Sequence, residues 1–512
     1  MSKKGLIRST GVIGIATAVS RVLGFARDII IANFFGTSLG AQAFVVAFRI
    51  PNSLRDLVGE GAANAAIVPV LTEYKAIKDE KEFLRVSKVL FNISFLVLSL
   101  LTVLGIVFSP FIVRLIAPGF MAEPDKFDLT VKLNRIIFPY LILIGLTAYS
   151  MGVLNALKHF AAPAFGPALM NLALIVAAVW LCPRIGVAGL AIGVLAGGVL
   201  QLFLNVPFMY ALGIKPDFRE GLWQPAVKRI GRLLVPRALG SAVYQVNIFV
   251  DMILASFSWI VGSGGVAALY YANRLIQFPL AIFGLALAQA ALPKMSHEFA
   301  TDDIGKLKDT LGFSLRTVFT IMIPASFGLA VLGEPIIRIL FERGEFTSYS
   351  TAITQSALFF YSFGLIAYGG IKILVTAFYS MHDTMTSVKT ASAAVVLNVI
   401  LNLILMWPLK LGGLALATSI SATFNMVVLY ILLRKRIGDF GTSRIMDSFA
   451  RVLASSVVMA VVLKVLLASF SGASVVGLFT AIVGGIATFA VMSYLFGVRE
   501  IKDLLAWTLK RK

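Results

Sequence analysis

Charged residues inside apolar stretches are the feature of this sequence most able to do chemistry. The first apolar stretch of the chain contains Arg21, Arg27 and Asp28. An arginine at the centre of a bilayer costs about 2.5–3.5 kcal/mol on insertion scales, so such residues predict a wet cavity or a charged partner. At about 100° per residue, Arg21 and Asp28 share one stripe of a helix. Ser20, Gly24 and Arg27 share the adjacent stripe.

The second apolar stretch carries a similar set of charges. Arg49, Asp56 and Glu60 would share a stripe in an unbroken helix, and Arg55 lies between them in the sequence. Pro51 is expected to bend this helix, because a proline removes a backbone hydrogen bond and clashes with the preceding turn. The second stretch therefore also predicts a helix that directs charged groups at one region.

The eighth apolar stretch places Tyr270, Asn273, Arg274 and Gln277 on one helix face. The three stretches together hold more arginines than acids: Arg21, Arg27, Arg49, Arg55 and Arg274 against Asp28, Asp56 and Glu60. This surplus predicts an anionic ligand, because the guanidinium fork matches phosphate oxygens in a bidentate manner. Internal pairing stays open as the alternative, with Arg27 on Asp28, and Arg49 and Arg55 on the acids of their own stretch.

The composition decides which class of protein must position these groups. The 512 residues are 59% hydrophobic and only 14% charged, with a formal net charge of +20. A soluble protein carries about 25% charged residues, and a disordered chain lacks this apolar content. A single cysteine, Cys182, excludes a disulfide scaffold. The composition therefore predicts an all-α polytopic membrane protein.

The apolar stretches predict about fourteen membrane-spanning helices. Each expected span has about the 20 residues that a bilayer requires. Most of the 45 lysines and arginines fall in alternate loops, which the positive-inside rule places in the cytoplasm together with both termini. The expected spans are residues 9–34, 38–60, 88–112, 133–156, 162–182, 186–210, 234–260, 265–291, 312–334, 354–379, 387–408, 412–433, 449–468 and 474–496.

The chain also matches itself after a shift of 224 residues. Pro69 corresponds to Pro293, Arg114 to Arg338, and Gly189 to Gly413. Six spans in each repeat give two lobes of the same orientation, which predicts a central cavity and transport by alternating access. A channel or a passive bundle is the alternative. The predicted domains are residues 1–224, 225–448 and 449–512, the last holding two extra helices.

Other polar residues carry weaker predictions. Asp251 lies near Gln245 and Asn247 and could bind a coupling cation or pair with an arginine. His382 and Asp383 are expected to serve a helix end. The three histidines lack metal-ligand spacing, and neither a phosphate-binding loop nor a nucleophile or acid–base set indicates an enzyme. We therefore expect no resident metal or cofactor and no nucleic-acid partner.

The motifs in these stretches resemble the MurJ (MviN) family of lipid II flippases, within the multidrug/oligosaccharidyl-lipid/polysaccharide exporter superfamily. The resemblance covers essentially the whole chain. It rests on residues 20–28 (SRVLGFARD), 51–55 (PNSLR), 59–62 (GEGA), 271–275 (YANRL) with 278–279 (FP), and 342–346 (ERGEF).

The resemblance implies the substrate and the site. Lipid II, an undecaprenyl-pyrophosphate carrying a disaccharide-peptide, would move from the inner to the outer leaflet of the bacterial cytoplasmic membrane. The family's cavity residues correspond to Arg21, Arg27, Arg55 and Arg274, with Asp28 and Glu60 beside them; Asn273 lies next to Arg274 in its motif. The last two spans would form a groove for the lipid tail.

The resemblance also raises expectations about coupling and partners. Transport would be coupled to the membrane potential or to a monovalent cation. Membrane lipids and cell-wall synthesis enzymes would be further partners. This chain has Gln42 where relatives often have an aspartate, so any function of that carboxylate is in doubt. The alternatives are a flippase for another polyprenyl-pyrophosphate oligosaccharide, or a non-transporting scaffold of cell-wall synthesis.

Overall fold

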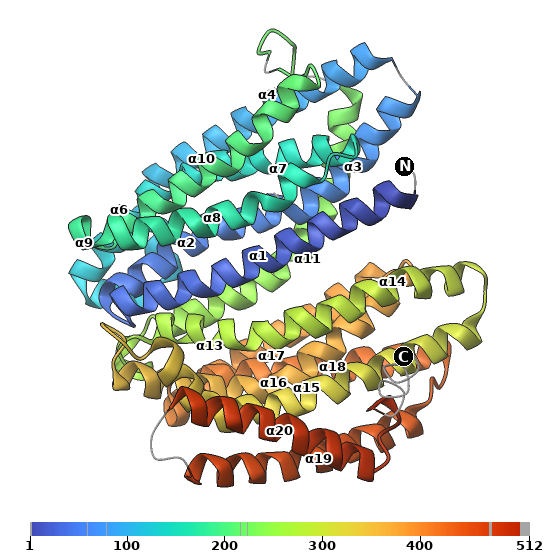
Figure 1. The fold of residues 1–512 in the computed structure, drawn as a ribbon. Coiled ribbons are helices and arrows are strands. Elements are labelled where there is room, and N and C mark those ends of the chain that lie inside the picture. Colours follow the sequence, from blue (N-terminus) through green and yellow to red (C-terminus); the bar gives the residue numbers. More distant parts are fainter. Residues whose placement is uncertain are drawn as a thin grey trace. The chain divides into compact units, whose positions relative to one another are not determined.

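The protein is seen in a computed structural model, and its described part is helical throughout, with no strand (Figure 1). This confirms the predicted all-α fold. The structure describes residues 3–58, 60–77, 79–215, 217–222, 224–469 and 474–501. Within those ranges the side chains of residues 3–10, 13, 56–65, 235–241, 243 and 244 lie outside the description.

Eleven helical segments of the described chain are long and apolar enough to cross a bilayer. The other predicted spans coincide with α1 (Lys3–Phe35), α2 (Leu39–Val58) and α11 (Pro225–Ala255). The expected span 38–60 is α2, and a further helix, α3 (Glu60–Ile77), follows it. The chain is therefore a multi-pass membrane protein with about fourteen spans.

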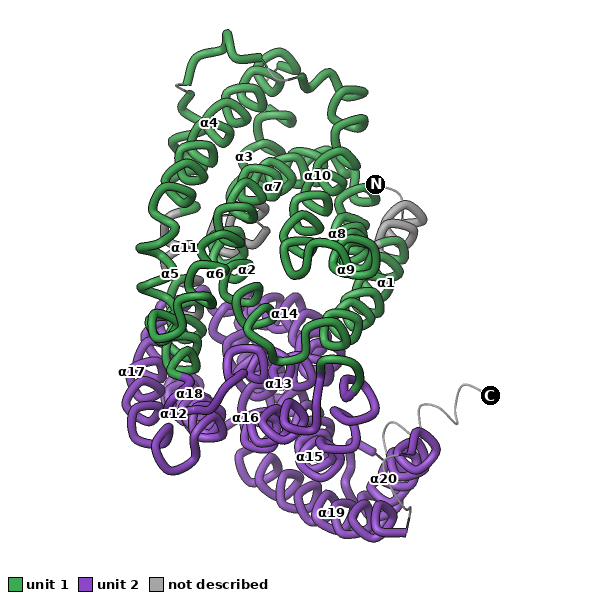
Figure 2. Tube along the Cα trace, turned by 90° about the vertical axis from the view of Figure 1, so that its left-hand side faces the viewer, with its two compact units in different colours: residues 1–257, 343–345 green, residues 258–342, 346–512 purple. Residues whose placement is uncertain are grey.

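By its internal contacts the chain divides into two compact units (Figure 2). Unit 1 comprises residues 1–257 and 343–345, and unit 2 comprises residues 258–342 and 346–512. Helix α11 packs on α2 and α3 and so belongs to unit 1, although the repeat assigns it to the second lobe. The domain boundaries at 224 and 448 follow sequence similarity rather than contacts, and they stay a prediction.

Unit 1 is built on pairs of packed helices. Helix α1 lies against α8, and α10 lies against both α7 and α8. Phe44, Tyr140, Leu174 and Leu190 lie in one buried core, which fixes α1 and α2 against their neighbours. The remaining helices of this unit are α4 (Glu80–Val107), α5 (Ser109–Ile116), α6 (Pro124–Ile137), α7 (Tyr140–Ala156), α8 (Ala161–Trp180), α9 (Cys182–Ile185) and α10 (Ala188–Ala211).

Unit 2 packs α16 between α15 and α18, while α19 lies on α15 and pairs with α20. A short π-helical segment, residues 280–284, interrupts the expected eighth span between α13 and α14. Such segments often accompany functional positions. The helices are α12 (Ser258–Val261), α13 (Gly265–Pro279), α14 (Leu285–Ala300), α15 (Ile304–Phe341), α16 (Ser348–Ser380), α17 (Thr384–Leu409), α18 (Leu411–Ile437), α19 (Thr442–Ser469) and α20 (Val475–Leu495).

Candidate functional site

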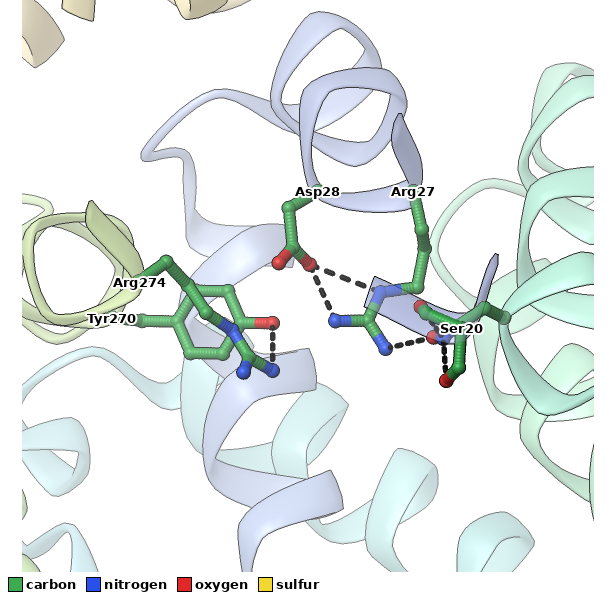
Figure 3. Close-up of polar contacts among 6 residues, drawn as sticks. Ser20, Arg27, Asp28, Tyr270 and Arg274 are labelled. Carbon is green, nitrogen blue, oxygen red and sulfur yellow. Dashed lines mark hydrogen bonds and ion pairs between the residues drawn. The ribbon is translucent and has the colours of Figure 1, made fainter. Parts of the chain in front are cut away.

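The first charged motif forms a buried, hydrogen-bonded group in α1 (Figure 3). Arg27 donates from Nε and Nη2 to Oδ1 of Asp28, over 3.0 and 2.6 Å. Both residues are buried, with 8% and 3% of their surfaces exposed. The internal pairing left open by the sequence is therefore present. A buried pair of this kind holds the guanidinium in one orientation.

The third contact of Arg27 comes from a residue that the sequence analysis missed. Nη1 of Arg27 donates to Oδ1 of Asn171 on α8, over 2.9 Å. The amide of Asn171 in turn donates to the backbone oxygen of Ser20, also over 2.9 Å (Figure 3). In the sequence, Asn171 stands out only as a polar residue in an otherwise apolar span. That observation does not indicate which residue it contacts.

Gly24 explains how α8 comes so close to this group. A Cβ at Gly24 would lie 3.3 Å from Nδ2 of Asn171. Ser20, Gly24 and Arg27 therefore all face Asn171, as their predicted shared stripe requires. Arg21, by contrast, is exposed, whereas Asp28 is buried. Arg21 and Asp28, which were predicted to share one stripe, thus lie in different environments. A ligand-binding role for Arg21 stays a prediction.

Helix α2 carries the second set of arginines. Arg49 and Arg55 are half-buried, and Pro51 lies inside the helix between them. Between the arginines, the hydroxyl of Ser53 donates to Oε1 of Gln245 on α11, over 3.0 Å. The side chains of Asp56 and Glu60 lie outside the described residues, so the predicted pairs with Arg49 and Arg55 stay predictions.

Helix α13 presents the predicted polar face of unit 2. Nη2 of Arg274 donates to the hydroxyl of Tyr270 over 3.1 Å, and Cζ of Arg274 lies 5.0 Å from the centre of the Tyr270 ring (Figure 3). Asn273 accepts a hydrogen bond from Gln277, one turn further along. The opposite side of α13, with Leu275 and Ile276, is buried. The predicted shared face is therefore confirmed, and the ring restricts the guanidinium of Arg274.

The structure also places three other residues that the sequence singled out. Asp251 is buried in α11, and Gln42 is buried in α2, where its amide faces the Thr37 carbonyl at 3.4 Å. Asp383 caps α17 as expected, because its carboxylate accepts hydrogen bonds from the backbone and hydroxyl of Thr386. Within the described chain no group of three His, Cys, Asp or Glu residues could hold a metal ion.

The contacts of this cap also set the pKa of Asp383, which lies between two membrane spans. Partial burial raises the pKa of its carboxyl, but the two hydrogen bonds from Thr386 and the ion pair with Arg436 outweigh that effect. The net result is a pKa below the ordinary value for aspartate. Asp383 therefore caps α17 as a carboxylate.

A family model and several known proteins match most of this chain. The family model described as "Lipid II flippase MurJ" matches residues 31–484. A "Probable lipid II flippase MurJ" of Vibrio cholerae is 36% identical over 522 residues, which covers 99% of this chain and 98% of the relative. A "Lipid II flippase MurJ" of Burkholderia cenocepacia is 34% identical over 82% of each chain.

Solved structures show the same architecture. A structure titled "Lipid II flippase MurJ, inward closed conformation" matches with a TM-score of 0.82 and 28% identity, over 96% of this chain and 99% of that one. An inward-facing multidrug exporter of the MATE family matches with a TM-score of 0.69 and 16% identity, over 83% of this chain and 98% of that one, which supports the fold alone.

Proposed function

We propose, because the chain belongs to the MurJ family of lipid II flippases, that it moves lipid II from the inner to the outer leaflet of the bacterial cytoplasmic membrane by alternating access. Lipid II is the substrate that the family name gives. This family consists of lipid flippases, and we infer that the chain acts as a transporter rather than as an enzyme.

The fixed guanidinium of Arg27 is the observation that carries this function. Lipid II presents a pyrophosphate that must leave water, and a preoriented guanidinium can take over hydrogen bonds from that water. Asp28 and Asn171 hold Arg27 in position within unit 1, while the Tyr270 ring restricts Arg274 within unit 2. We assign Arg27 and Arg274 to the pyrophosphate, together with Arg21, Arg55 and Asn273. Asp28 and Glu60 act as positioning acids.

The orientation proposed for the chain follows from its charges. The loops rich in lysine and arginine would face the cytoplasm, and both termini would lie there too. The last two helices, α19 and α20, would supply the groove for the polyprenyl tail. Many large apolar side chains on these helices are exposed, including Val461, Val465, Phe479 and Ile486.

The energy source is proposed to be the membrane potential, a monovalent cation, or both. Moving one elementary charge through 100 mV is worth about 2.3 kcal/mol, so a potential can bias an arginine-bearing cavity. Asp251 is the candidate cation ligand, because it is a buried acid in α11. Cell-wall synthesis enzymes remain expected partners.

Depletion of the chain in its own cells, followed by measurement of lipid II exposed on the outer leaflet, tests the proposal. Exposure should fall and precursor should accumulate inside, and wild type should restore both. Arg274→Ala should fail to restore exposure at equal membrane abundance, whereas Arg338→Ala, at an exposed position on α15, should succeed. Unchanged exposure on depletion, with no second flippase present, would overturn the proposal. Full rescue by Arg27→Ala and Arg274→Ala would favour a scaffold.

A further inference from the structure

The chain makes a defined turn where α20 ends. Gly497 has a φ of +75°, and the backbone nitrogen of Val498 donates to the Ser493 carbonyl over 2.9 Å. A hydrogen bond of this kind across a helix end is the Schellman motif, which favours glycine because glycine adopts a positive φ without strain. Val498 itself is buried. The turn therefore fixes the direction of the residues that follow α20.

Glu500 follows this turn and contacts two other helices of unit 2. Its Oε1 accepts a hydrogen bond from Nε of Arg316 on α15 over 2.6 Å, and its Oε2 accepts one from the Ser448 hydroxyl on α19 over 3.1 Å. Glu500 is only 6% exposed, so this ion pair is shielded from water. Hydrogen bonds between ionised partners are roughly twice as strong as those between neutral groups. We call these three residues the Glu500 cluster, and they join the end of α20 to α15 and α19.

A second arginine binds the last turn of α20 to α19. Nη1 of Arg451 donates to the Phe496 carbonyl over 2.7 Å, at the residue that caps the helix. A cation is favourable there, because the carbonyls at a helix C-terminus carry partial negative charge. Gly497 leaves room for the guanidinium, since a Cβ at this glycine would lie 3.0 Å from Nη1 of Arg451. The same end of α20 is therefore bound by two charged side chains.

Further along the same helices, α19 and α20 are attached to α15 by apolar packing. Leu332 of α15, Leu463 of α19 and Ala481 of α20 lie in one buried core. Leu332 is about 24 Å along α15 from Arg316, at 1.5 Å per residue. The α19–α20 pair is therefore attached to α15 at two separate levels, and the Glu500 cluster provides the attachment at the end of α20.

The position of Arg316 has a counterpart in unit 1. The shift of 224 residues pairs Arg316 with Asn92 on α4, as it pairs the buried Leu307 with the buried Phe83. Nδ2 of Asn92 donates to two backbone oxygens of the segment 217–220, over 2.9 and 3.1 Å, where the chain has left α10. The same place on the two helices thus binds a segment that follows a membrane span. In unit 2 an arginine at this place allows the bound group to be a carboxylate.

We propose that Glu500 is a positioning residue for transport: through Arg316 and Ser448 it holds the end of α20 on α15, so that the α19–α20 pair moves as one body with the rest of unit 2. This inference rests on the proposed function, in which α19 and α20 supply the groove for the polyprenyl tail. A tail in that groove then moves together with unit 2 when this unit changes its conformation. Without the Glu500 cluster, α20 moves separately from α15, and the tail no longer follows the unit.

Distances between two spin labels test the attachment independently of transport. The labels replace Asp309 on α15 and Val491 on α20, which are both exposed, in full-length protein that also carries Cys182→Ala. The otherwise unchanged chain should give one dominant distance, both with and without added lipid II. Two comparable populations in that chain would show that α20 moves on α15, and they would overturn the proposal.

Variants of the Glu500 cluster should then change this distance distribution. Glu500→Gln should raise the population of a second distance about tenfold or more, the effect of losing one charged hydrogen bond. Arg316→Glu should do the same, and its combination with Glu500→Arg should restore the dominant distance. Glu334→Gln is the matched control, since this carboxylate of α15 forms an exposed pair with Arg338. An unchanged distribution in Glu500→Gln, or an equal change in Glu334→Gln, contradicts the attachment.

The length of the lipid tail separates a positioning role from general structural support. Purified protein in proteoliposomes is given either lipid II or an analogue with a farnesyl tail, which is shorter than α20, whose 21 residues span about 31 Å. Glu500→Gln should move lipid II several-fold more slowly than wild type does, but the farnesyl analogue equally fast. Equal slowing of both lipids would assign Glu500 to general stability and overturn its positioning role. If wild type moves neither lipid, the proposed function fails and the positioning role fails with it, whereas the label distances still show whether the Glu500 cluster holds α20.

Discussion

Two nitrogen atoms of Arg27 donate to a single carboxylate oxygen of its neighbour Asp28, over 3.0 and 2.6 Å. Adjacent helical residues point about 100° apart, so the long arginine side chain must bend around the helix to reach its neighbour. The amide oxygen of Asn171 receives the third donor. The charge that the membrane would penalise is thus paired inside one unit before any ligand arrives.

Removing the carboxylate should destabilise the protein strongly. Asp28→Asn removes the carboxylate charge that pairs with the buried Arg27, and breaking such a buried pair costs about 3–5 kcal/mol. The unfolding midpoint of the protein purified in detergent should fall accordingly. The matched control is Asp447→Asn, which breaks an exposed pair with Arg451 at 2.9 Å and should cost at most about 1 kcal/mol. Equal midpoints for the two variants would show that Arg27 does not depend on Asp28.

Asn171 should matter for transport as well as for folding. Asn171→Leu removes the acceptor for Arg27 and the donor to Ser20, so a buried polar group loses its partner at a cost of about 1–3 kcal/mol. Outer-leaflet exposure of lipid II should fall, because Arg27 is then less firmly oriented. Asn205→Leu provides a comparison, because Asn205 is a buried asparagine of α10 whose amide donates to the Gln201 carbonyl of the same helix. Normal exposure in Asn171→Leu at equal abundance contradicts the positioning role.

Gly24 offers a graded test of the same contact. Gly24→Ala places a methyl group 3.3 Å from the Asn171 amide, which must shift by a few tenths of an ångström. We expect a modest loss of exposure for Gly24→Ala and a near-complete loss for Gly24→Leu, because a larger side chain separates α1 from α8. Gly14→Ala and Gly14→Leu serve as controls, since a Cβ at Gly14 meets no atom within 4 Å. The two series should differ in lipid II exposure, and matching losses would refute a specific role for the Gly24 contact.

The pairing of Arg27 with Asp28 could be predicted from the sequence, but the contact with Asn171 could not. The physical reason is general. Hydropathy finds spans, and helical periodicity finds residues that share a face, as at Tyr270 and Arg274. Neither tells which helix packs on that face, so Asn171 on α8 stayed unseen until the fold placed it. The different burial of Arg21 and Asp28 could not be predicted from periodicity either, because residues on one stripe about 100° wide can become exposed or buried when the helices pack.

Variants at Tyr270 and Arg274 should separate the hydroxyl contact from the planar fork of the guanidinium. Tyr270→Phe removes the acceptor for Arg274 but keeps the ring, so lipid II exposure should fall no more than a few-fold. Arg274→Lys keeps the charge but loses the planar fork, and exposure should fall about tenfold or more if the fork binds pyrophosphate. Comparison of the two variants at equal membrane abundance decides between these contributions. Full activity of Arg274→Lys would mean that charge alone is sufficient.

Stability should depend on pH through the cap of α17. The pKa of Asp383 is lower in the folded protein than the value of about 3.9 expected for the unfolded chain. Its ionised form therefore stabilises the fold, fully above about pH 5, and this contribution disappears as the pH falls through the folded-state pKa. Wild type should exceed Asp383→Asn in unfolding midpoint at neutral pH, and the difference should shrink below about pH 4. A difference that stays constant down to pH values near 2 would show that the charge of Asp383 contributes nothing to the cap.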